Sequence, residues 1–94
     1  MKQAAIPPQI IEEIKKAQRN EITEHHIYLR LASVIKDRKN SEVLSKIGND
    51  ELRHYELWKK FTGVDVKPSK WKIFKFFWIA RVFGLTFGIK LMEN

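Results

Sequence analysis

The sequence contains no cysteine, which excludes a disulfide framework, a catalytic thiol and any zinc site built on thiolates. Helix-breaking residues are also scarce, with four glycines and three prolines among 94 residues. No stretch alternates apolar and polar residues as a half-buried strand does. In the most apolar segment, 71–94, the longest uncharged run is eight residues (82–89), far below the roughly 18–20 that a membrane-spanning helix requires.

The chain length suits one small domain spanning residues 1–94, whose single core gives modest stability unless oligomerisation or a bound metal adds to it. The first residues lack the apolar core of a signal peptide, so the expected location is cytoplasmic. The net charge of +7 is uneven: residues 1–58 carry ten Lys/Arg and nine Asp/Glu, whereas residues 59–94 carry eight and two. A basic excess on an aromatic, apolar segment fits a membrane surface at least as well as nucleic acid.

Apolar periodicity and breaker residues predict an all-α fold with helices over 8–37, 41–62 and 70–93. The expected start and stop signals are Pro7 and Pro8 for the first helix, Asn40 or Ser41 as the cap of the second, Gly63 as its end and Ser69 as the cap of the third. The short link at 36–42 favours an antiparallel hairpin of the first two helices. The third segment, 70–94, is aromatic and basic.

In the predicted hairpin each helix has an apolar face, called its seam, that packs on the other helix. Near the middle of each seam the apolar residues give way to polar ones, and this polar part is called the waist. Spacings of three and four place Glu21 and the Glu24/His25 pair in the seam of the first helix, and Glu51 and His54 in that of the second. In an antiparallel hairpin the two waists meet at similar height. Buried carboxylates without partners are very costly, so this layer requires a cation or protons.

Carboxylate and imidazole donors suit divalent iron or manganese. Glu51 and His54, three residues apart, can reach one ion from one helix face, and Glu21 can bridge to a second. Di-iron bundles use a Glu from each of two helices and a Glu-x-x-His from each of the other two. The hairpin supplies half of that set, so either a second copy or a second helix pair after residue 94 would complete it.

The stretches QRNEITEHHIYLRLA and NDELRHYELWKKFTG resemble the first two helices of a rubrerythrin-type, ferritin-like domain. The resemblance is closest to the membrane-associated rubrerythrin-like domains that precede vacuolar-iron-transporter-type domains, and ARVFGLTFGIKLMEN also has a counterpart there. It implies half of a four-helix bundle, a carboxylate-bridged di-iron centre and reaction with oxygen or peroxide. The rubredoxin-type cysteines that relay electrons in rubrerythrin are missing from this sequence.

Carried over to this chain, the resemblance implies that the carboxylates of Glu21 and Glu51 and the imidazole of His54 are metal ligands. Tyr28 would donate a hydrogen bond near the site and belong to its catalytic group. Glu24 is a further metal candidate, and Glu93 would match the first acid of the family's third helix. The implied activity is that of a ferroxidase or a peroxide-reducing oxidoreductase. The expected partners are further copies of the chain in a homodimer or higher homo-oligomer, and a membrane surface or an iron-transporter domain. Nucleic acid is not an expected partner.

The same residues also have interpretations that involve no metal. Glu21 could form an ion pair with Arg53 or Lys46. Glu24 and His25 could be supporting residues, accessory ligands or an exposed flank, and His26 is expected to face solvent. Tyr28 could be a core residue with a paired hydroxyl, whereas Trp58 and Phe61 are expected to be core residues. The segment 70–93 could lie on a bilayer, form an oligomer interface or be the third bundle helix. The alternative function is a non-catalytic basic module that binds membrane or nucleic acid through residues 59–94.

Overall fold

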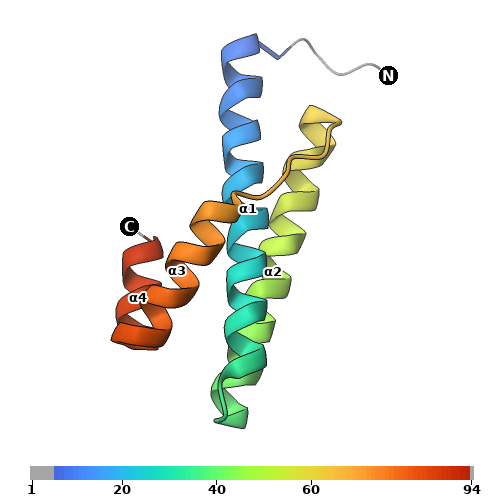
Figure 1. Ribbon diagram of the computed structural model, residues 1–94. Helices are drawn as coiled ribbons and strands as arrows, with labels where there is room; N and C mark the ends of the chain where they lie inside the picture. Colours follow the sequence, from blue (N-terminus) through green and yellow to red (C-terminus); the bar gives the residue numbers. More distant parts are fainter. Residues whose placement is uncertain (1–5, 94) are drawn as a thin grey trace.

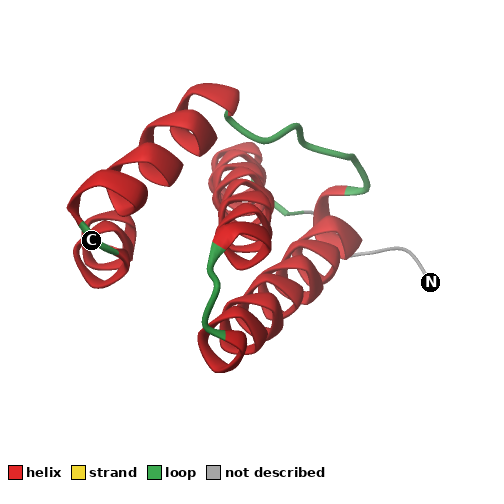
Figure 2. Cartoon of the chain, turned by 60° about the horizontal axis from the view of Figure 1, so that its bottom comes forward, coloured by secondary structure: helices red, strands yellow, loops and turns green. Residues whose placement is uncertain are grey.

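The computed structural model describes residues 6–93 and is all-helical over that range, as the sequence predicts. Its elements are α1 (Pro8–Val34), α2 (Arg38–Thr62), α3 (Lys70–Phe83) and α4 (Leu85–Glu93). Helices α1 and α2 run antiparallel along most of their length (Figure 1). Viewed closer to the helix axes, α1 lies between α2 on one side and the α3–α4 pair on the other (Figure 2). The predicted hairpin is therefore confirmed.

The turn between α1 and α2 lies earlier than predicted. Helix α1 ends at Val34 rather than residue 37, and Asp37 caps α2 by accepting a hydrogen bond from the Lys39 backbone N–H at 3.0 Å. The predicted caps, Asn40 and Ser41, lie inside α2, and the Ser41 hydroxyl donates to the Ala32 carbonyl at 2.7 Å. Asp37 takes the position because its carboxylate both accepts from the free N–H groups and suits the positive end of the helix.

The predicted helix over 70–93 is two helices. Ser69 caps α3 and Gly63 ends α2, as predicted, but Gly84 has φ 107° and breaks the segment, a conformation that glycine adopts without steric cost. After this turn α4 packs back against α3 so closely that a Cβ on Gly88 would lie 2.7 Å from the Ala80 Cα. Gly84 and Gly88 form a G-x-x-x-G, a spacing that permits close contact between helices, and here Gly88 makes that contact within the chain.

The apolar core lies where α1 meets α2 and α3. Its buried members are Ile27, Tyr28, Leu31, Ala32, Leu44, Ile73 and Ala80. The prediction that Trp58 and Phe61 are core residues is wrong for Phe61, which is 48% exposed, and Trp58 is only half-buried. Both lie in the C-terminal half of α2, where they line an open cavity together with Glu21 of α1.

The connection between α2 and α3 is fastened to α1 by polar side chains. Gln18, fully buried, donates to the Val64 carbonyl at 2.8 Å and accepts from the Thr62 hydroxyl at 2.5 Å. Thr23 accepts from the Ser69 backbone N–H at 2.9 Å. Because these groups are paired in the interior, the start of α3 has a fixed place beside the middle of α1. That placement determines which face of α1 meets α3 and α4.

Candidate metal centre

The polar waist forms one cluster of ligand-type atoms across the hairpin. Glu51 and His54 are one turn apart on α2, and Glu21 faces them from α1. The His54 Nδ1 lies 3.2 Å from the Glu51 Oε1 and 3.5 Å from the Glu21 Oε1. One atom from each of these three residues lies within 4.8 Å of the others. The structure therefore brings together the three residues that the sequence put at the centre of its metal hypothesis.

A second cluster adjoins the first and shares Glu51 with it. Its other members are Glu24, one turn along α1 from Glu21, and Glu93 at the end of α4, again with ligand atoms within 4.8 Å of one another. Glu24 was predicted as a metal candidate, whereas Glu93 came only through the family resemblance. Spacing within one helix could not reveal Glu93, because the turn at Gly84 brings it to the hairpin.

The carboxyl groups of this layer are held in an environment that disfavours their charge. Burial, followed by the neighbouring carboxyl of Glu51, raises the pKa of Glu21 to about 7. Burial likewise raises the pKa of Glu24 and that of Glu51. The side chains of Glu21 and Glu51 are 22% and 13% exposed, so solvent screens them poorly. In the absence of a cation, this part of the protein holds protons near neutral pH.

Lysine and arginine do not neutralise the acids of the first cluster. Across residues 6–93, the ion pairs of Glu21 and Glu51 involve His54 only, and Arg53 pairs with Asp50. The alternative in which Glu21 pairs with Arg53 or Lys46 is therefore not what the structure contains. The nearby Trp58 side chain lowers the pKa of Glu21 in part. The charge balance is left to protons or to a metal ion.

Tyr28 supports the second cluster from the core. Its ring is buried at 2% exposure, and its hydroxyl donates to the Glu93 Oε2 at 2.6 Å. Burial and this bond raise the pKa of Tyr28 well above its usual range, so the hydroxyl stays protonated and acts as a donor. Both interpretations offered by the sequence, core packing and a hydrogen bond near the site, apply to this residue.

The two neighbouring histidines of α1 lie outside the clusters. His25 is neither an exposed flank nor a member of either group of ligand atoms: it is buried, and its Nδ1 pairs with the Gly48 carbonyl at 2.7 Å. This places its ring against the close α1–α2 contact, where a Cβ on Gly48 would lie 3.2 Å from the Tyr28 Cβ. His26 is exposed, as predicted.

The first cluster opens on one side to solvent. A cavity of about 450 Å³ beside it is lined by Glu21, His54, Leu57, Trp58 and Phe61. The imidazole is 52% exposed there, and Leu57 and Phe61 are each about half exposed. The opening is thus a polar site with an apolar rim.

No family model, curated protein sequence or solved structure matches this chain. The case for a metal centre therefore depends on the donor set. Four carboxyl groups and one imidazole, with no lysine or arginine paired to the acids of the first cluster, match the oxygen and nitrogen donors that iron or manganese prefers. The two clusters, each of which could hold a metal ion, share one carboxyl group, that of Glu51.

Proposed function

We propose that the chain is a ferritin-like, rubrerythrin-type protein that binds a pair of ferrous ions and supports their oxidation by oxygen or peroxide. The observation that carries the proposal is the shared position of Glu51, whose carboxylate belongs to both clusters. A carboxylate has two oxygens, so one residue can contact two ions. Manganese, which takes the same donors, is the alternative metal.

The residues divide into two ligand groups. Glu21 and His54 would hold the first ion, Glu24 and Glu93 the second, and Glu51 would bridge them. When bound, two ferrous ions supply the two electrons that reduce one molecule of peroxide, with two protons, to water. Tyr28 fixes the orientation of the Glu93 carboxylate through its hydrogen bond, as outer-sphere partners of metal ligands commonly do.

A second copy of the chain would complete the bundle. Four-helix di-iron proteins use two Glu-x-x-His motifs, whereas this chain has one, Glu51 to His54. The half-exposed imidazole and the apolar rim formed by Leu57 and Phe61 support a proposal that a helix of a partner covers this side. A homodimer would then bury the rim and supply further ligands, and it fits a function in iron handling or peroxide defence.

Anaerobic loading with ferrous iron tests this proposal. Protein of known oligomeric state is titrated with Fe²⁺ and then exposed to oxygen or peroxide while absorption is followed. We expect about two irons for the two clusters of one chain. We also expect their oxidation to be much faster than that of free Fe²⁺ in the same buffer. Protein that binds no metal under any reconstitution would contradict the proposal. A fully active monomer would retain the metal site and contradict only the dimer.

A second candidate function concerns the outer surface of α3 and α4. Large apolar side chains there are exposed, among them Trp71, Phe74, Trp78, Val82, Phe83 and Phe87. Residues 66–92 include six lysines and arginines and no acid. Among the described helices, none is long and apolar enough to cross a bilayer. Aromatic rings with flanking basic groups favour a helix pair that lies on an anionic membrane surface.

Co-sedimentation with vesicles tests this second function. The protein is expected to pellet with vesicles rich in anionic lipid at low salt and to be released at high salt, since the charge attraction is screened. A Trp71→Ser/Trp78→Ser variant should lose most of this binding, whereas Leu57→Ser on α2 should keep it. Failure of the unmodified protein to pellet at low salt would remove this function.

A further inference from the structure

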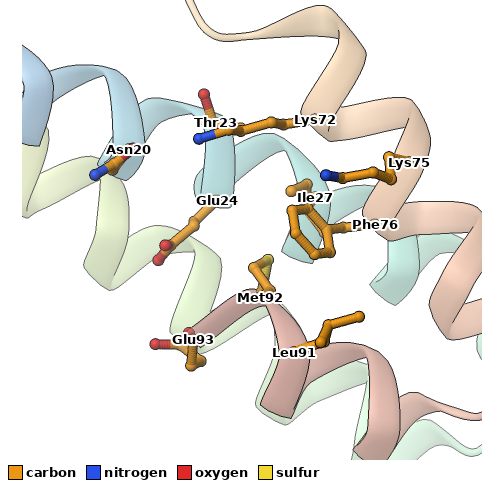
Figure 3. Close-up of a pocket in the computed structure, with 10 residues that line it drawn as sticks. All are labelled: Asn20, Thr23, Glu24, Ile27, Lys72, Lys75, Phe76, Leu91, Met92 and Glu93. Atoms are coloured by element: carbon orange, nitrogen blue, oxygen red, sulfur yellow. The ribbon is translucent and has the colours of Figure 1, made fainter.

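A cavity of about 470 Å³ lies between α1, α3 and α4, directly beside the second cluster. Glu24 and Glu93 form part of its wall, and Lys72 and Lys75 reach into it from α3 (Figure 3). Its remaining surface is made by Asn20, Thr23, Ile27, Phe76, Leu91 and Met92. The cavity thus has two carboxylates on one side and two amines on another.

The two amines form no ion pair among the described residues. The ion pairs and side-chain hydrogen bonds found between residues 6 and 93 do not involve the Nζ of Lys72 or that of Lys75. The Lys75 Nζ instead lies 4.9 Å from the centre of the Phe76 ring, and Figure 3 shows the Lys72 side chain extended towards Thr23. The two ammonium groups are therefore free to bind an anion from solution.

The charge of the cavity depends on whether metal is present. Without metal, the carboxyl groups of Glu24 and Glu93 lie in the same cavity as the two lysines and offset part of their positive charge. A divalent cation between Glu24, Glu51 and Glu93 cancels the carboxylate charge and leaves the lysines unbalanced. This cluster offers three carboxyl groups and no imidazole, so a divalent ion held there would accept further oxygen ligands from outside the cluster.

Resting on the proposed metal centre, we propose that this cavity binds a small multivalent oxyanion of the phosphate type. One end of the anion contacts the ammonium groups of Lys72 and Lys75, and the other contacts the cation at Glu24, Glu51 and Glu93. Ammonium groups bind phosphate as point charges with strong hydrogen bonds. Because the cation and the anion attract each other directly, each raises the affinity of the other by the same factor.

Calorimetric titration of the full chain with Mn²⁺ and then with inorganic phosphate tests the inference. Manganese is used because it occupies the same donors without reacting with oxygen during the titration. We expect the Mn²⁺-loaded protein to bind phosphate at least about tenfold more tightly than the metal-free protein. The variant Lys72→Gln/Lys75→Gln should lose that gain, although its Mn²⁺ affinity without phosphate stays within about threefold.

The control is Lys67→Gln/Lys90→Gln, which removes the same charge from residues that do not line the cavity. It should bind phosphate like the unmodified chain, and circular dichroism should show equal helicity in both variants. Equal loss of phosphate binding in both variants, or equal affinity with and without Mn²⁺, would overturn the inference while leaving the metal centre intact. Absence of Mn²⁺ binding in this titration, together with absence of Fe²⁺ binding in the anaerobic loading, would overturn the proposed function itself.

Discussion

On the proposed metal centre, replacing Glu51 with alanine is expected to remove both metal ions, a larger effect than that of replacing Glu21 or Glu93 alone. The carboxylate belongs to both clusters, so its loss leaves Glu21 with His54 at one position and Glu24 with Glu93 at the other. Two protein ligands hold a divalent ion poorly, and we expect the affinity at each position to fall by at least about 100-fold. Metal analysis after dialysis and calorimetric titration measure the change.

Matched substitutions separate the two positions. Glu21→Ala should lose one ion and Glu93→Gln the other, each leaving about one ion bound, whereas Glu56→Ala, an exposed acid on the same helix as Glu51, should bind metal normally. The metal-free Glu51→Ala protein should keep its helicity, because the substitution removes a buried acid from a crowded acidic layer. Full metal content in this variant would show that the ligands lie elsewhere.

The metal-free protein is expected to become less stable as pH rises from about 4.5 to about 7. The pKa of Glu21 is about 7 in the fold against 4.5 as its ordinary value, and those of Glu24 and Glu51 are also raised. Below pH 4.5 these acids are mostly protonated in both the folded and the unfolded chain, so their burial does not lower the free energy of unfolding. Above it the unfolded chain releases the protons first, so the equilibrium moves toward unfolding. Thermal melts across this range should show a decrease of several degrees.

Metal should reverse the sign of this pH dependence. Bound cations require ionised carboxylates, so affinity and the stability gained from binding rise as protons leave Glu21. The difference in melting temperature between metal-loaded and metal-free protein should therefore widen between pH 5.5 and 7.5. Glu21→Gln should flatten much of the metal-free slope, while Glu56→Gln should not change it. A metal-free protein that gains stability over this range would contradict the burial of these acids.

The hairpin and its polar waist were predictable because both depend on local spacing. A side chain three or four residues from another shares its helix face, so the position of Glu21 opposite Glu51 and His54 follows once the helices are antiparallel. The burial of Leu31 and Leu44 follows from the same periodicity. The end of α2 at Gly63 and the cap at Ser69 were also predictable, since few residues suit those backbone positions.

The remaining features depend on contacts between segments distant in the sequence. Nothing local in the run 70–93 decides between a straight helix and a turn at Gly84, because the packing of Gly88 on Ala80 is what favours the turn. The membership of Glu93 in the second cluster follows from that turn. The burial of His25 depends on the Gly48 carbonyl across the helix interface. Phe61 is exposed because, among the described helices, only α1 packs against α2.

Because of the turn at Gly84, the two clusters, here treated as two halves of one larger cluster, need chain loops of different length to close before their residues meet. The residues Glu21, Glu51 and His54 meet as soon as the hairpin closes a loop of about 30 residues. The meeting of Glu24 and Glu93 closes a loop of about 70 residues and also needs α4 folded back. Loop closure costs more chain entropy as the loop lengthens, though slowly. We therefore expect the hairpin half of the cluster to assemble first during folding, and the docking of α4 on Tyr28 to complete the second half.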